Sequence, residues 1–183
     1  THHSKLKDEI TYFIINFSRV DTTPQSDLYN SYGTKIMSLE TADLSLLFEA
    51  GYQFPETFKV KAGDGITDLY GVMYKPFNFD STKLYPLIEY VYPGPQTEAV
   101  NKSFSVRMDR TDRMAQLGFI VISLGNRGGH PDRSKRYHSY GYGNLRDYGL
   151  QGKKVVADQL SYRHKFIDIN KVGIFGLSGG GFM

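Results

Sequence analysis

The sequence has no cysteine and no tryptophan among its 183 residues. Without cysteine, a disulfide framework, a thiol nucleophile and a zinc site built on cysteine are excluded. No apolar run approaches the roughly 18 residues of a membrane-spanning helix, and the start at Thr1 shows no hydrophobic signal core. An excess of one charge is also missing, since the formal net charge is +3 and the basic residues are scattered. The sequence therefore predicts no nucleic-acid-binding surface.

Motifs for cofactors and metals are scarce as well. The glycines from Gly176 to Gly181 do not form the G-x-G-x-x-G pattern of a dinucleotide loop, and no Lys-Ser or Lys-Thr follows them. The residues that come nearest to a metal-ligand set are His130, Asp132 and His138. Their spacing follows no helix face, so we interpret them as surface-loop residues. The sequence predicts neither a cofactor nor a bound metal.

What is present is the composition of a folded chain. Apolar residues make up 40%, and 14 tyrosines with 12 phenylalanines provide an aromatic-rich interior. The length allows one domain, or one domain with part of another. In the first third we expect strands at 10–17 and 34–39, a polar stretch at 18–30, and a short helix that Thr41 caps and Gly51 ends.

From residue 58 onward, strands and helices are expected to alternate. A hairpin comes first, with strands at 58–61 and 69–74 on either side of Gly63-Asp64-Gly65. Further strands are predicted at 87–92, 119–124 and 172–175, and helices at about 106–117 and 145–166. This order is typical of an α/β fold with a mainly parallel sheet and helices on both faces. Ligands of such sheets bind at the carboxyl ends of the strands, where residues 92–95, 125–129 and 176–180 are expected to meet.

The most informative motif is G-L-S-G-G at 176–180, directly behind the apolar strand 172–175. The pattern G-x-S-x-G is typical of a sharp strand-to-helix turn that exposes a nucleophilic serine, here Ser178. Glycines flank the serine because side chains there would collide with the neighbouring strand or the following helix. The alternative is a glycine-rich turn whose serine only caps a helix.

Three segments stand in a characteristic order: Y-P-L-I-E-Y-V-Y-P-G-P at 85–95, N-R-G-G at 126–129 and G-L-S-G-G-G-F-M at 176–183. In order and spacing they resemble the prolyl oligopeptidase family, specifically its dipeptidyl peptidase IV branch. The resemblance implies that 57–183 form the N-terminal part of an α/β-hydrolase domain. It further implies that 1–35 are the last strands of a β-propeller, with 36–56 as a linker.

By that resemblance the chain is part of a serine peptidase that acts on peptides. Ser178 is the implied nucleophile, and the backbone N–H of Gly179 with the hydroxyl of Tyr92 forms the implied oxyanion hole. Arg127 is a candidate substrate-binding residue, although the side chain is equally suited to fixing its own loop. The resemblance places the aspartate and histidine of the triad beyond Met183, so the 183 residues alone are expected to be nearly inactive. It allows a homodimer in the intact protein, and a periplasmic, secreted or membrane-anchored location.

One position departs from the family pattern. Members of this branch often carry an aromatic residue just after the nucleophile, where this chain has Gly179. We therefore hypothesise a wider primary pocket and a less strict preference for proline or alanine before the scissile bond. Two other functions stay open: an esterase or acyl hydrolase, because the turn at Ser178 supports any acyl transfer, and a non-catalytic module for binding or assembly.

Overall fold

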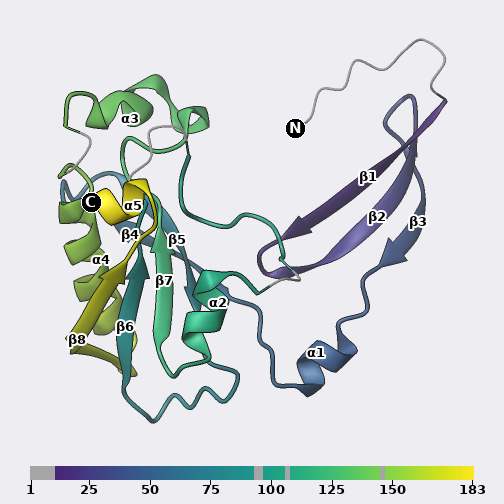
Figure 1. Cartoon of the computed structure of the whole chain (residues 1–183). Coiled ribbons are helices and arrows are strands. Elements are labelled where there is room, and N and C mark those ends of the chain that lie inside the picture. Colours follow the sequence, from purple (N-terminus) through teal and green to yellow (C-terminus); the bar gives the residue numbers. More distant parts are fainter. Residues whose placement is uncertain (1–10, 93–96, 106–107, 145–146) are drawn as a thin grey trace.

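The computed structural model describes residues 11–92, 97–105, 108–144 and 147–183, and within them the chain forms two β-sheets (Figure 1). The first sheet is antiparallel and has the order β1-β2-β3, with β1 at Tyr12–Arg19, β2 at Thr22–Asn30 and β3 at Lys35–Thr41. The short helix α1, Ser45–Glu49, lies in the segment that leads to the second sheet. The three sequence motifs at 85–95, 126–129 and 176–183 lie in the strands of the second sheet or directly after them.

The polar stretch at 18–30, in which the sequence predicted no strand, contains strand β2. Its side chains are polar, but it pairs along most of its length with both β1 and β3. Pro24 is tolerated in this central strand because the register with β1 shifts between Phe17 and Arg19, and proline occurs in sheets at such irregularities. Its carbonyl accepts the N–H of Ala42.

The second sheet has five strands in the order β4-β5-β7-β6-β8. Their bounds are β4 Glu56–Lys61, β5 Asp68–Tyr74, β6 Tyr85–Tyr90, β7 Ile120–Leu124 and β8 Ile167–Phe175. Strand β6 is parallel to β7 and to β8, whereas β5 is antiparallel to β4 and to β7. The sheet is therefore mixed rather than mainly parallel, because the hairpin β4–β5 extends the parallel strands.

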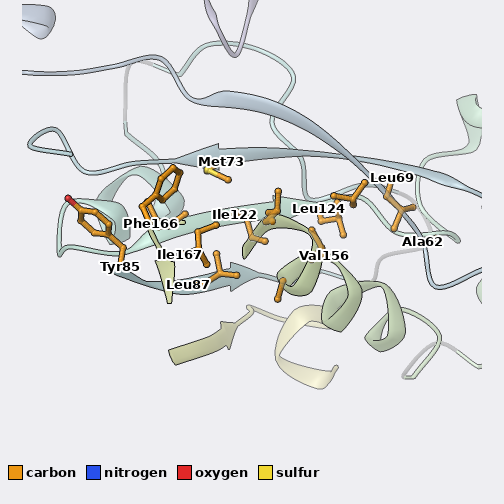
Figure 2. Packing of buried hydrophobic residues seen from close by; sticks show 14 of the residues in the cluster. Ala62, Leu69, Met73, Tyr85, Leu87, Ile122, Leu124, Val156, Phe166 and Ile167 are labelled. Atoms are coloured by element: carbon orange, nitrogen blue, oxygen red, sulfur yellow. The ribbon is translucent and has the colours of Figure 1, made fainter. Parts of the chain in front are cut away.

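Helices cover both faces of this sheet, as the sequence predicts. Helix α4, Leu150–Arg163, places Val156, Ala157 and Leu160 on one face, where Leu87, Ile122, Leu124 and other strand residues meet them (Figure 2). Helix α2, Arg110–Ala115, covers the other face, where Ala115 packs in a cluster with Val72 and Val121. Between these two helical layers the carboxyl ends of β6, β7 and β8 lie side by side, since Tyr90 pairs with Ser123 and with Phe175.

Several element boundaries differ from the expected ones. Thr41 ends strand β3 and does not cap α1; Asp43 accepts the N–H of Ser45 there instead. The first residues of the expected linker, 36–41, are accordingly part of the first sheet. Helix α4 begins at Leu150, later than expected, and β8 begins earlier, at Ile167.

The loop that follows β7 contains three short helical turns that the sequence did not predict. They are η1 at Pro131–Arg133, α3 at Lys135–His138 and η2 at Ser139–Gly141. Ser134 accounts for α3, because its hydroxyl accepts the N–H of Tyr137 in the manner of an N-cap. Among the described residues, no helix has both the length and the apolar composition to cross a membrane.

Candidate active site

Ser178 sits between β8 and the short helix α5, Gly179–Phe182, in a strained backbone conformation. Its φ is 55° and its ψ is −120°, and a positive φ is uncommon for a residue that has a Cβ. The turn is tight because a Cβ on Gly176 would come within 2.4 Å of the Gly180 carbonyl carbon. A Cβ on Gly180 would come within 2.0 Å of the Val91 carbonyl oxygen. The structure thus forms the strand–turn–helix that G-x-S-x-G predicts.

Tyr92 lies against this turn. A Cβ built on Gly179 would be 3.5 Å from Cζ and 3.7 Å from the hydroxyl oxygen of Tyr92. The β-ladder continues to this point, because the N–H of Val91 donates to the carbonyl of Phe175 at 2.9 Å. Gly179 opens helix α5, and the N–H groups of a first helical turn have no acceptor within their helix. The ring and hydroxyl of Tyr92 thus lie beside Gly179, the residue that follows Ser178. Residues 93–95, which continue the motif of Tyr92, lie outside the described residues.

Asn126 connects this pair to the loop after β7. Its side chain is 4% exposed, and its Nδ2 donates to the carbonyl oxygen of Tyr92 at 3.4 Å. Asn126 also contacts Tyr148, in the turn before α4. The sequence places Asn126 in a family motif but assigns it no role, because its burial depends on three segments that are distant along the chain.

Glu98, in the loop after β6, also contacts the loop after β7. Its Oε1 accepts the Tyr137 hydroxyl at 2.5 Å. Its side chain fills the space beside Gly125 and Gly129, where an added Cβ would come within 2.9 Å and 2.4 Å of Glu98 atoms. Burial, reinforced by the Glu98 carboxylate, raises the pKa of the Tyr137 hydroxyl far above its usual range, so Tyr137 stays a donor. Sequence reasoning missed Glu98, since nothing in its neighbours marks it as packed under a glycine loop.

Arg127 pairs with an aspartate and stacks on a tyrosine of the protein itself. Its Nη1 lies 2.7 Å from Asp64 Oδ2, and its Nη2 donates to the Tyr140 hydroxyl at 2.6 Å. Hydrogen bonds from the Thr67 hydroxyl and N–H and from the Ile66 N–H hold the pKa of Asp64 far below its usual range, and Arg127 adds to this effect. These contacts favour the loop-fixing role of Arg127; a contact with substrate stays a prediction.

The comparisons with known proteins bear on the same residues. The sequence model described as the prolyl oligopeptidase family matches residues 104–183, the stretch that contains β7, α4, β8 and the serine turn. The chain belongs to the prolyl oligopeptidase family. Dipeptidyl peptidase 8 of Homo sapiens is 35% identical to it over 133 residues, which are 72% of this chain and 15% of that protein.

Solved structures of similar proteins agree with this family. Dipeptidyl peptidase 4 of Porphyromonas gingivalis superposes with a TM-score of 0.74 at 25% identity, over 93% of this chain and 24% of that one. A protein of Bacteroides ovatus gives the same TM-score at 30% identity, with the same coverage of both chains. This member of the prolyl oligopeptidase family thus spans about a seventh to a quarter of the length of the relatives that it matches.

Beneath the site, this prolyl oligopeptidase family chain buries a pair of opposite charges. Glu89 on β6 is 2% exposed and Lys153 on α4 is 6% exposed, with 3.1 Å between Oε1 and Nζ. Lys153 Nζ also donates to the carbonyl of Leu124, the last residue of β7, at 2.9 Å. Burial raises the pKa of Glu89, and the charge of Lys153 opposes this rise. Lys153 thus ties α4 to the strand ends that carry the loops.

The histidines considered as metal ligands face different partners. His138 Nδ1 lies 2.7 Å from the Gly129 carbonyl, whereas His130 Nδ1 lies 3.3 Å from Asp132 Oδ2. Across residues 11–92, 97–105, 108–144 and 147–183, no group of three or more metal-binding side chains comes together.

Proposed function

We propose that this sequence is part of a serine peptidase of the dipeptidyl peptidase type, which cleaves peptides through an acyl-enzyme on Ser178. The matched relatives named above are dipeptidyl peptidases from Homo sapiens and Porphyromonas gingivalis. Within that likeness we infer an α/β-hydrolase domain from residue 57 onward. We infer that the sheet β1-β2-β3 is the end of a β-propeller.

The observation that carries the proposal is the strained Ser178 with Tyr92 beside it. A φ of 55° at a serine costs free energy, and glycine contacts on both sides hold the chain in it. A serine that only capped a helix would need no such strain, and this serine forms no side-chain cap hydrogen bond with α5. The strain is therefore best explained by the need to present Oγ to a substrate.

In the proposed reaction, Ser178 Oγ attacks the peptide carbonyl carbon, and its proton passes to a histidine base. The carbonyl oxygen becomes an oxyanion that accepts hydrogen bonds from the Gly179 N–H and the Tyr92 hydroxyl. The tetrahedral intermediate expels the amine, which takes the proton from the histidine, and water then hydrolyses the ester on Ser178. We infer that the histidine and its aspartate partner lie in parts of the full-length protein outside this sequence. The 183-residue chain alone is then expected to be slower by several powers of ten.

The test uses the full-length protein that carries this sequence and chromogenic dipeptide amides as substrates. Ser178→Ala is expected to abolish turnover, and Tyr92→Phe to lower kcat by about 10²- to 10³-fold with little change in KM, since the oxyanion forms only after attack. Tyr32→Phe is the matched control, because Tyr32 is 92% exposed in the turn between β2 and β3. Equal kcat for Tyr92→Phe and Tyr32→Phe would contradict the role of Tyr92.

The two other functions predict different results in the same assay. An esterase would hydrolyse p-nitrophenyl esters with a Ser178-dependent rate and leave the peptide amides intact. A non-catalytic module would hydrolyse neither substrate, and Ser178→Ala would behave like the parent protein.

A further inference from the structure

A basic cavity of about 480 Å³ opens among the loops at the end of β7. Its walls come from the β4–β5 turn, from Arg127, and from the segment η1–α3–η2. The lining residues are Asp64, Ile66, Thr67, Arg127, Arg133, Ser134, Arg136, Tyr137 and Tyr140. The charged side chains among them are three arginines and one aspartate, so the cavity has an excess of two positive charges.

The excess resides on Arg133 and Arg136. Arg127 is paired with Asp64 at 2.7 Å, and the low pKa of that aspartate keeps the pair ionised. Within the part of the chain that the structure describes, no carboxylate lies within ion-pair distance of Arg133 or Arg136. The acidic residues around Arg133 are engaged elsewhere: Asp132, its neighbour in sequence, lies by His130, and Asp68, whose carbonyl accepts Arg133 Nη2, pairs its carboxylate with Lys59 and Lys61. Glu98, which lines a neighbouring pocket together with Arg133, accepts the Tyr137 hydroxyl.

Arg133 is held in place before any ligand arrives. Its Nη2 donates to the Asp68 carbonyl at 2.8 Å, and its Cζ lies 4.2 Å from the centroid of the Tyr137 ring. The guanidinium is planar, and its contact with the ring fixes the orientation of that plane, so that its remaining N–H groups are held in the fork geometry that a carboxylate accepts. Tyr140 forms another wall and is itself stacked against Arg127 at 3.7 Å. The cavity thus presents two exposed arginines to an anion, of which Arg133 is held by its own contacts.

The cavity lies on the same edge of the sheet as Ser178. Leu124 at the end of β7 pairs with Gly71 in the middle of β5, and the antiparallel β5 therefore begins, with the β4–β5 turn before it, beyond the end of β7. Tyr90 at the end of β6 pairs with Phe175 at the end of β8. Two to three strand spacings separate the β5–β7 end from β8, which amounts to about 10–15 Å. An extended peptide advances about 3.3 Å per residue, so the cavity lies about three or four residues from a scissile bond at Ser178.

We propose that this cavity binds a carboxylate of the peptide substrate about three or four residues from the bond that is cleaved. The inference rests on the proposed peptidase function and adds a preference for acidic peptides. Two kinds of substrate carry the required group: a peptide with an aspartate or glutamate side chain at that distance, and a short peptide whose C-terminal carboxylate reaches it.

Binding is measured by calorimetry at low salt on the full-length Ser178→Ala protein, which cannot turn substrate over. The first probe is glutarate. The second is a set of peptides with glutamate or glutamine at each of the third to fifth positions on either side of the scissile bond, each with a free or an amidated C-terminus. Arg133→Gln/Arg136→Gln removes the excess charge, and Lys135→Gln is the matched control, since Lys135 lies on α3 but does not line the cavity.

Glutarate is expected to bind the parent, and the double variant to bind it about three- to tenfold more weakly, because both arginines keep solvent contact. Lys135→Gln is expected to match the parent. A glutamate peptide that outbinds its glutamine partner identifies a side-chain carboxylate, whereas a loss on amidation identifies the C-terminus. Either preference must disappear in the double variant.

Two results would overturn the inference. One is glutarate binding that is absent from the parent or unchanged in the double variant. The other is glutarate binding through the arginines while no peptide pair differs in affinity. Failure of the proposed peptidase function would look different. In that case the wild-type protein would hydrolyse no peptide, but glutarate would still bind and its binding would still depend on the two arginines.

Discussion

The three glycines around Ser178 differ in how much space surrounds them; they are Gly176, Gly179 and Gly180. An added Cβ would strike backbone atoms at Gly176 and Gly180, at 2.4 Å and 2.0 Å. At Gly179 the nearest atom would be Tyr92 Cζ at 3.5 Å, an ordinary contact. Steric crowding thus requires two of the glycines, whereas the third, where relatives of the dipeptidyl peptidase IV branch often carry an aromatic residue, is free to vary.

This difference predicts opposite outcomes for two alanine variants. Gly180→Ala is expected to displace the turn from Val91 and to abolish peptidase activity of the full-length protein, with a stability loss of about 1–3 kcal/mol from overpacking. Gly179→Ala is expected to fold with an unchanged melting temperature and to keep activity. Thermal unfolding and kcat/KM measure both effects. An active, stable Gly180→Ala protein would show that the turn is not packed against β6 in this way.

Gly179 also predicts how the site selects the residue before the scissile bond. Without an aromatic side chain at this position, we expect bulkier residues to be cleaved at rates comparable to those for proline and alanine. The measurement is kcat/KM for dipeptide amides that differ only there, with Gly179→Tyr as the matched variant. Strict proline preference in the parent would contradict a wider pocket.

Asp64 predicts an acid-dependent stability. Its pKa is depressed in the folded chain below the ordinary value of 3.8, so its contribution is present above about pH 3.8 and disappears as the pH falls through the folded pKa. Asp64→Asn is expected to melt lower than the parent at neutral pH and to approach it in acid. A melting-temperature difference that stays constant across this range would show that the carboxylate does not stabilise the β4–β5 turn.

At the scale of residues, the sequence allowed prediction of the groups that a motif contains and not of those that act by burial. Tyr92 lies beside Gly179, the residue that follows Ser178, and the roles that the motifs imply for these three residues stay predictions. Glu98 and Lys153 gain their positions only through packing between distant segments. A charged residue in a strand or helix carries no local sign that it will be buried.

Among the elements, α4 and the ends of β6 and β7 form one supporting unit. Lys153 contributes one ion pair and one hydrogen bond across it, to Glu89 and to the Leu124 carbonyl. Lys153→Met is expected to cost about 3–5 kcal/mol, since it leaves a buried carboxyl without a partner. The adjacent Lys154 is exposed, so Lys154→Met is the control.

The pH dependence of the Lys153→Met defect distinguishes the ion pair from simple packing. Burial already raises the pKa of Glu89, and loss of Lys153 removes the charge that opposes the rise. A raised folded pKa means that stability is kept below the ordinary value of 4.5 and lost as the pH rises. Urea unfolding is therefore expected to show a larger Lys153→Met defect at neutral than at acid pH, and Glu89→Leu to relieve it. A defect that is independent of pH would indicate lost packing alone.

The order of elements from residue 56 onward followed from apolar runs and turn residues, because each strand there is flanked by glycine or proline. Strand β2 did not, since its stability comes from pairing with two neighbours while its own residues, Thr22–Asn30, are mostly polar. The short turns after β7 depend on single caps such as Ser134. Local sequence patterns thus predict strands with buried apolar side chains better than strands such as β2, which are stabilised by backbone pairing with their neighbours.

At the scale of the molecule, the first sheet and the α/β part are joined by more than the covalent linker. Val20, in the β1–β2 turn, is 7% exposed and packs with Val72 and Tyr74 of β5. The hydroxyl of Ser18 accepts the N–H of Phe104 at 3.2 Å. The two parts that the sequence separates by a linker at 36–56 are therefore in contact through Val20 and Ser18.

An aromatic cluster in the linker completes this connection. Tyr52 is 8% exposed, and its ring lies 5.7–6.2 Å from those of four phenylalanines. They are Phe48 and Phe54 of the linker, Phe77 after β5 and Phe104 before α2. Rings at such distances add to the burial that holds the segment between β3 and β4 against the α/β part.

Tyr52→Ala is accordingly expected to loosen the linker while the α/β core stays folded. Removal of a buried aromatic ring costs about 3–5 kcal/mol, and the loss falls on a segment with few other buried side chains. Limited proteolysis of the full-length protein is expected to cut faster between β3 and β4, and Leu46→Ala, at a position 80% exposed on α1, to leave the cutting rate unchanged. Equal rates for Tyr52→Ala and the parent would mean that the linker is held by Val20 and Ser18 rather than by its rings. In that case Val20→Ala, and not Tyr52→Ala, would release the first sheet.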